Sequence, residues 1–183
     1  DDADAAFDIV STALQNGKDV VSASKKMIAE QLPALLELQQ ETGRSLLYEP
    51  AACASIPVIR NLEEYYDNDL LHSIRAIVNG STNFILTKIF EEGLDFRQAL
   101  VLAQQLGFAE SDPMLDVEGF DAVNKWTFLL THAYGIVTTP ENILLNGIQN
   151  IQAGDAEVAA AKRQQIKLVA QAQKGRDNKV AAF

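Results

Sequence analysis

The sequence predicts an α/β (α+β) fold, in which a mixed β-sheet is covered by helices and preceded by the last βα units of a doubly wound domain. One observation predicts this fold class, and a second indicates a globular protein. Near the start of the chain, short apolar runs typical of buried strands alternate with amphipathic segments of helical length. The composition is that of an ordinary globular protein, because 48% of the residues are hydrophobic and 22% are charged.

Residues 1–49 contain two helix–strand units. Apolar residues recur at helical spacing from Phe7 and again from Met27, and Gly17 and Gly43 are placed to end these two helices. A short apolar run follows each helix, and this alternation favours a parallel sheet. The expected elements are helices over 7–15 and 27–41 and strands over 19–23 and 45–49.

The rest of the chain begins with a turn of small residues over 50–55 and alternates less regularly. Asp95 and Gln98 have the spacing of a capping box, which predicts the start of a helix. The expected elements are helices over 57–66, 84–92, 95–107, 118–134 and 154–174, strands over 70–78, 142–151 and 180–183, a turn over 79–83, and an acidic loop over 108–117.

The charge balance excludes two classes of partner. The chain has 15 Lys and Arg against 25 Asp and Glu, a formal net charge of −10, which opposes binding to nucleic acid or to an anionic membrane surface. Apolar runs stay well below the roughly 20 residues that span a bilayer. Cys53 is the single cysteine and the first residues do not have the order of a signal peptide, so we expect a reducing, cytoplasmic location.

The segment after Gly119 is the most informative for chemistry. From Ala122 to Tyr134 the one formally charged residue is Lys125, in a helix that is apolar on every side and therefore expected to be buried. A buried lysine is costly unless it is paired, and Asp121 lies one helical turn earlier. Burial and nearby anions shift a lysine pKa in opposite directions, so this pair is a candidate for catalysis.

Two less specific interpretations of these charges stay open. An aspartate and a lysine four residues apart can form a surface ion pair at a helix start. The acids upstream could also bind a divalent metal, but Glu110, Asp112 and Asp116 do not follow the order of a calcium loop.

Two turns have the form of ligand sites. Ser81 or Thr82 can cap the helix that follows the turn 79–83, and the amides there can receive a carboxylate or phosphate, although such turns are commonly structural. Residues 22–25 follow a buried strand, where open parallel sheets bind ligands. His132 is expected to be a satisfied core histidine and Cys53 an inert thiol.

Three motifs in order resemble homoserine dehydrogenase. Residues 79–83 read Asn-Gly-Ser-Thr-Asn where that family has Asn-Gly-Thr-Thr-Asn. Residues 107–113 match its Gly-Tyr-Ala-Glu-x-Asp-Pro loop, with phenylalanine in place of tyrosine. The pattern Asp-x-x-Gly-x-Asp-x-x-x-Lys follows over 116–125. The resemblance extends over essentially the whole chain.

The resemblance implies a role for each matching position. Lys125 corresponds to the proton donor to the aldehyde oxygen, and Asp121 orients it. Residues that hold the amino-acid substrate correspond to Glu110, Asp116 and Asp121, and we expect the substrate's carboxylate at the helix start, at Ser81 and Thr82. Residues at the NAD or NADP cofactor correspond to Lys25 and Gly107, and Ser22 joins them because it follows a buried strand. A sodium ion, bound largely through main-chain carbonyls, corresponds to Glu49, Ala52, Ala54 and Ile56. Ser24 and the pair Ala54-Ser55 depart from the family pattern.

The implied enzyme is an NAD(P)-dependent oxidoreductase acting on a CH–OH group. It interconverts L-homoserine and L-aspartate 4-semialdehyde in threonine, methionine and isoleucine biosynthesis, as a homodimer. Residues 1–49 would be the C-terminal remnant of the Rossmann-like nucleotide-binding domain, and residues 50–183 a catalytic and dimerisation domain truncated at its C-terminus. We expect this fragment alone to be inactive. The alternatives are a non-catalytic amino-acid-binding and dimerisation module, or part of a bifunctional aspartate kinase–homoserine dehydrogenase.

Overall fold

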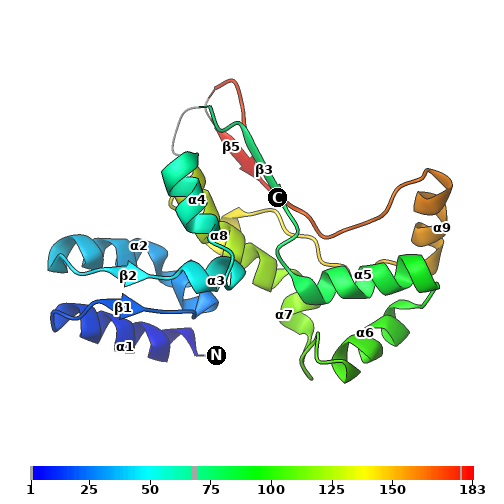
Figure 1. Ribbon diagram of the computed structural model, residues 1–183, viewed down its shortest axis with the longest axis horizontal. Helices are drawn as coiled ribbons and strands as arrows, with labels where there is room; N and C mark the ends of the chain where they lie inside the picture. The colour runs from blue at the N-terminus through cyan, green and yellow to red at the C-terminus, as the bar shows by residue number, and fades with distance from the viewer. Residues whose placement is uncertain (1, 67–69, 178) are drawn as a thin grey trace. The chain divides into compact units, whose positions relative to one another are not determined.

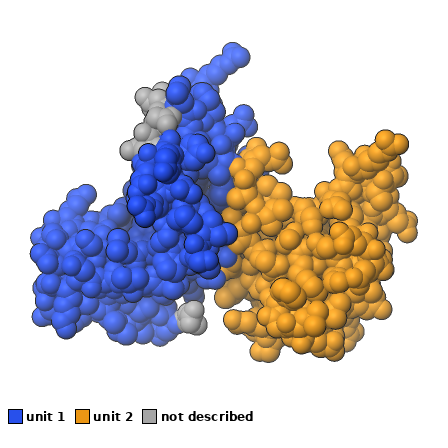
Figure 2. All heavy atoms as spheres, in the orientation of Figure 1, with its two compact units in different colours: residues 1–74, 123–144, 172–183 blue, residues 75–122, 145–171 orange. Residues whose placement is uncertain are grey.

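The computed structural model describes residues 2–66, 70–177 and 179–183, and consists of helices with short strands (Figure 1). The chain divides into two compact units (Figure 2). Unit 1 comprises residues 1–74, 123–144 and 172–183, and unit 2 comprises residues 75–122 and 145–171. This division differs from the predicted boundary after Glu49, which stays a prediction. In the described part of the chain, the helices are too short or too polar to cross a membrane.

The first part of unit 1 contains two helices and a parallel pair of strands. These elements are α1 (Ala3–Gln15), β1 (Val20–Val21), α2 (Lys25–Thr42) and β2 (Leu46–Leu47). Val20 pairs with Leu46 and Val21 with Leu47, so the predicted parallel sheet is confirmed. Each strand is shorter than expected. Next to the first pair, the Ser45 amide donates to Asp19 Oδ1 at 2.9 Å instead of to the backbone of the other strand.

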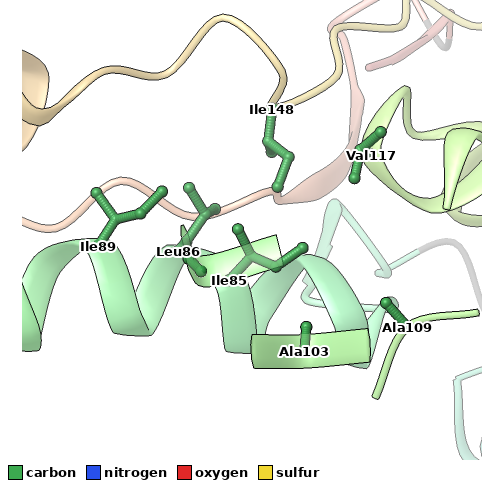
Figure 3. Packing of buried hydrophobic residues seen from close by; sticks show 8 residues of the cluster. Ile85, Leu86, Ile89, Ala103, Ala109, Val117 and Ile148 are labelled. Atoms are coloured by element: carbon green, nitrogen blue, oxygen red, sulfur yellow. The ribbon is translucent and has the colours of Figure 1, made fainter. Parts of the chain in front are cut away.

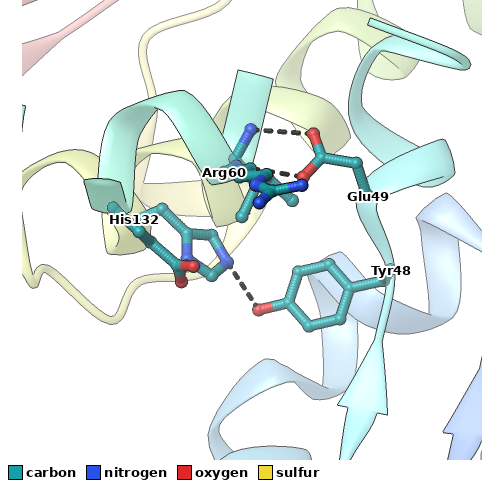
Figure 4. A network of polar contacts seen from close by, with 6 residues as sticks. Tyr48, Glu49, Arg60 and His132 are labelled. Carbon is teal, nitrogen blue, oxygen red and sulfur yellow. Dashed lines mark hydrogen bonds and ion pairs between the residues drawn. The ribbon is translucent and has the colours of Figure 1, made fainter. Parts of the chain in front are cut away.

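The next part of unit 1 corrects the turn predicted over 50–55. A short helix, α3 (Glu49–Cys53), occupies most of it, because Pro50 suits the first turn of a helix and alanines follow. Helix α4 (Val58–Tyr65) forms as predicted. Both carboxylate oxygens of Glu49 accept hydrogen bonds at the start of α4, from the Ile59 amide at 2.9 Å and the Arg60 amide at 3.0 Å (Figure 4).

Helix α8 (Phe120–Tyr134) continues from unit 2 into unit 1 at Val123. Its unit 1 part is buried, as its all-round apolar sequence predicted. The residues with less than 10% exposure are Val123, Trp126, Thr127, Phe128, Leu129, Leu130 and Ala133. Tyr48 packs edge-on against Phe128, with ring centroids 5.8 Å apart.

Unit 2 is built around α5 (Gly80–Glu92), α6 (Phe96–Gln105), α7 (Met114–Val117) and α9 (Ala153–Ala161). Helix α5 begins at Gly80 instead of Phe84, because Asn79 caps it and residues 80–83 form its first turn. The capping box of Asp95 and Gln98 is confirmed at the start of α6. Helix α7 lies in the segment predicted as a loop.

The core of unit 2 lies between α5, α6 and the segment after Gly147. Figure 3 shows Ile148 directed toward the side of α5 that carries Ile85 and Leu86. The buried members of this cluster are Ile85, Leu86, Ile89, Ala99, Ala103, Ala109, Val117 and Ile148. Two of the predicted acids are therefore next to core residues in sequence, because Glu110 follows Ala109 and Asp116 precedes Val117.

A three-stranded sheet has the order β3 (Ser73–Ala76), β4 (Ala170–Lys174) and β5 (Val180–Ala182), and β4 and β5 are antiparallel. Two predictions were wrong. Residues 142–151 form no strand. Asn142 is the last residue of a 3-10 helix, η1 (Pro140–Asn142). The last helix ends at Ala161 instead of residue 174. Ala170 and Ala172 are buried on alternate positions of β4, which is the period of a strand.

Candidate active site

Asn79 brings together two of the acids that the sequence singled out. Its side-chain nitrogen donates to Asp116 Oδ1 at 2.7 Å and to Asp121 Oδ2 at 2.9 Å. Its Oδ1 accepts from the Thr82 amide at 2.8 Å and from Thr82 Oγ1 at 2.9 Å. Asn79 is 5% exposed. The predicted site did not include Asn79, although an asparagine directly before a helix is a strong N-cap signal.

Ser81 and Thr82 lie in the first turn of α5, and neither is its N-cap, contrary to the expectation for this turn. The Ser81 hydroxyl donates to the Phe108 carbonyl oxygen at 2.6 Å. The Thr82 side chain is fully buried and its hydroxyl is bonded to Asn79. Both hydroxyls therefore have partners within unit 2, and a role for this turn in binding a substrate stays a prediction.

The loop after α6 is held by several contacts within unit 2. Gly107 has a φ of +75°, which favours glycine at this position. The Phe108 ring stacks on Phe84, with centroids 4.4 Å apart. Gln104 donates to the backbone carbonyl of Glu110 at 3.0 Å, and Glu110 itself is exposed. The loop thus presents the Glu110 side chain to solvent from a fixed backbone.

The turn between α7 and α8, which separates Asp116 from Asp121, packs tightly against the segment 145–148. The Ile148 amide donates to the Val117 carbonyl at 2.8 Å. A Cβ added at Gly147 would lie 2.4 Å from that carbonyl oxygen and 2.7 Å from Glu118 Cα. Gly119, at a φ of +90°, approaches Leu145. Close backbone packing therefore fixes the turn between the two acids.

Lys125 lies one helical turn after Asp121 in α8 and is half-buried, in the part of the helix that belongs to unit 1. Within that unit its positive charge acts on Cys53. Burial raises the pKa of the Cys53 thiol and Glu49 adds to this effect, while Lys125 lowers it, and the net shift is upward. A raised pKa keeps the thiol protonated at neutral pH, which agrees with the expected unreactive cysteine.

The predicted cofactor residues of unit 1 lie where β1 connects to α2. Lys25 is the first residue of α2 and is half-buried, whereas the neighbouring Lys26 is exposed and lies 3.9 Å from Glu30. The Ser22 hydroxyl accepts from the Ser24 amide at 3.2 Å. The two adjacent lysines thus differ in exposure, and Lys25 begins the helix that follows β1.

The residues predicted to bind sodium lie in and after α3. The Glu49 carboxylate is engaged by the amides of α4, and the Ile56 carbonyl accepts from the Val58 amide at 2.8 Å. Ala54 has a φ of +52°, which is unfavourable for a residue with a Cβ. Ala52 is buried in α3. Among the described residues, no group of three His, Cys, Asp or Glu side chains is placed to hold a metal.

His132 is satisfied, as predicted, by two partners in unit 1 (Figure 4). Its Nδ1 lies 2.7 Å from Glu63 Oε1 and its Nε2 lies 2.8 Å from the Tyr48 hydroxyl. Because a carboxylate accepts, Nδ1 donates to Glu63, while Nε2 is bonded to the Tyr48 hydroxyl. This network joins α8, α4 and the residue after β2, so a structural role explains the position of His132.

Comparison with known proteins places the chain in a family. The family model described as "Homoserine dehydrogenase" matches residues 57–182, and the model "Homoserine dehydrogenase, NAD binding domain" matches residues 3–49. Similar curated proteins include the homoserine dehydrogenases of Corynebacterium glutamicum, 37% identical over 89% of this chain, and of Bacillus subtilis, 36% identical over 88%. The chain spans 37% of the length of each.

Solved structures give the same result and confirm the predicted fold class. A homoserine dehydrogenase from Thiobacillus denitrificans is 32% identical, with a TM-score of 0.94, and the match covers 99% of this chain and 42% of that one. A hyperthermophilic archaeal homoserine dehydrogenase in complex with NADPH is 33% identical, with a TM-score of 0.77, over 98% of this chain and 51% of that one. The chain therefore belongs to the homoserine dehydrogenase family.

Proposed function

We propose that this chain supplies the substrate-binding and proton-donating groups of a homoserine dehydrogenase, an enzyme of amino-acid biosynthesis. The full-length protein would interconvert L-homoserine and L-aspartate 4-semialdehyde with NAD(P). The observation that carries the proposal is the Asn79-linked pair of Asp116 and Asp121, because Asp121 lies one helical turn before Lys125 in α8. The matches over 3–49 and 57–182 support the proposed division of the chain into residues 1–49 and 50–183.

Lys125 is proposed as the proton donor. When bound, the nicotinamide supplies the hydride in the reducing direction and accepts it in the oxidising direction. During reduction, charge develops on the aldehyde oxygen, and the Lys125 ammonium donates a proton to that oxygen; during oxidation the amine takes the hydroxyl proton. Its half-buried position in an apolar helix limits competing hydration, which favours a role in proton transfer.

The acids of unit 2 are proposed to bind the substrate's ammonium group. Asp116 and Asp121 each have one oxygen bonded to the same neutral amide, so both lie close to one point. Glu110 is presented to solvent by the loop after α6. The first turn of α5, which contains Ser81 and Thr82, suits the substrate's carboxylate, since a helix N-terminus favours an anion.

The cofactor is proposed to contact Ser22, Lys25 and Gly107. Ser22 follows a strand of a parallel pair and Lys25 begins the next helix, and open parallel sheets bind ligands at such a connection. Sodium binding stays a prediction, and no step is assigned to it. The homodimer also belongs to this proposal. So does the cytoplasmic location, which the single cysteine, Cys53, supports.

The test is the rate of L-homoserine oxidation by the full-length protein with Lys125→Ala. We expect kcat to fall by about 10²–10⁴-fold, the usual contribution of a positioned acid or base. Lys88→Ala is the matched control, because Lys88 is also a half-buried helical lysine with a carboxylate, Glu92, one turn away. An unchanged kcat in the Lys125 variant would remove this lysine from the chemistry. Binding of L-homoserine by a wild type that does not oxidise it would favour the non-catalytic module.

A further inference from the structure

We propose that Asn79 is a positioning residue for the reaction: it holds Asp116 and Asp121 in the arrangement that binds the substrate's ammonium group. This inference rests on the proposed function. It starts from the contacts of one buried side chain, whose nitrogen bonds both carboxylates and whose oxygen bonds the first turn of α5.

The Asn79 carboxamide has one possible orientation. A carboxamide has two N–H donors and an oxygen with two lone pairs, and all four are used here. The donors go to Asp116 and Asp121, and the oxygen accepts from the Thr82 amide and the Thr82 hydroxyl. The reverse orientation would set the oxygen against two carboxylates and the nitrogen against a backbone N–H. Those repulsions leave the amide fixed.

Capping alone does not require asparagine at this position. Serine or aspartate would accept from the Thr82 amide and cap α5 equally well. Asparagine combines an acceptor directed at the helix with two donors on the opposite side of the group. The second function, holding the acids, therefore distinguishes asparagine from the other capping residues.

A neutral donor also suits the chemistry of the two acids. Two carboxylates bonded to one nitrogen, at 2.7 and 2.9 Å, repel each other, and a shared donor offsets that repulsion. Lysine or arginine at this position would hold the acids too, but it would bring a positive charge that competes with the substrate's ammonium group. Asn79 gathers the acids without adding a cation.

The surrounding structure makes this positioning effective. Asn79 is fixed to α5 through Thr82, and α5 is anchored in the unit 2 core. The turn between the two acids is fixed independently, by the Ile148 amide bonded to the Val117 carbonyl. Asn79 is therefore a direct link between the start of α5 and the two ends of the α7–α8 turn.

The experiment uses Asn79→Ser and Asn79→Asp in the full-length protein, with steady-state kinetics of L-homoserine oxidation. Both variants keep a capping acceptor, so the fold is retained, and thermal unfolding checks this. Asn79→Ser should raise KM for L-homoserine about 10- to 100-fold, as expected on losing hydrogen bonds to charged groups, with a smaller effect on kcat. Asn79→Asp should raise it further, because it adds a third negative charge. KM for NAD(P) should not change.

Asp95→Ser is the matched control, since Asp95 caps α6 in the same unit and its Oδ1 accepts from the Gln98 amide at 2.8 Å. It should leave KM unchanged. A KM within about twofold of wild type for Asn79→Ser, or an equal rise for Asp95→Ser, would overturn the inference while leaving the proposed function intact. Absence of turnover by the wild type would instead refute the proposed function and this inference with it.

Discussion

Replacing Gly147 by alanine should disturb the acids without touching them. The φ of Gly147 lies outside the left-handed region, so the effect is steric alone. The new Cβ would lie 2.4 Å from the Val117 carbonyl oxygen and 2.7 Å from Glu118 Cα, whereas real Cβ contacts stay above 3.0 Å. The α7–α8 turn must therefore move by roughly 0.6 Å, because backbone atoms cannot rotate away as a side chain can.

This displacement has two measurable consequences. Overpacking of this kind costs about 1–3 kcal/mol of stability, which urea denaturation of the full-length protein measures. A misplacement near 1 Å can cost about 100-fold in catalysis, so a shift of this size should raise KM for L-homoserine on the order of 10-fold. The cause is that Asp116 and Asp121 lie at the two ends of the displaced turn.

Gly154→Ala is the matched substitution with the opposite expected sign. Gly154 lies in the first turn of α9, and a Cβ there meets nothing within 4 Å. Alanine should stabilise this helix by a few tenths to about 1 kcal/mol and leave KM unchanged. If the two variants changed stability in the same direction and by similar amounts, the argument from close backbone packing at Gly147 would be wrong.

Two further predictions concern unit 1. Glu49→Ala should lower the free energy of unfolding by about 1–2 kcal/mol, because the Ile59 and Arg60 amides lose their acceptor; Glu49→Gln, which keeps one oxygen, should lose less in the same denaturation assay. Burial, with Glu63 as the second cause, raises the pKa of Tyr48 to about 12. The native state then keeps a proton that the unfolded chain loses above pH 10, so this contribution to stability is complete below about pH 10 and falls by roughly 1.4 kcal/mol per pH unit up to about pH 12. Tyr48→Phe should remove that pH dependence, and a wild-type-minus-variant difference that stays constant from pH 9 to about pH 11 would contradict it.

The sequence predicted best what depends on neighbouring residues. Helical spacing and caps located α1, α2, α6 and α8, and the capping box at Asp95 has both of its bonds. The strand predictions were less accurate, because a strand is defined by its partner. Residues 170–174 pair with segments elsewhere in the chain to form β4, and no local signal distinguished them from the end of a long helix.

The same distinction explains which part of the site could be predicted. The motifs identified the acids and Lys125 because their spacing follows a family pattern. Asn79 was seen within its turn but not as a site residue, because its bonds to the acids span 37 and 42 positions of sequence. Its cap, in contrast, spans three. A capping residue selected for its local role would be exchangeable for serine or aspartate. The distant bonds remove that freedom, so stability of the α5 start and placement of the acids depend on a single side chain. Kinetics of variants that preserve the cap can separate these two functions.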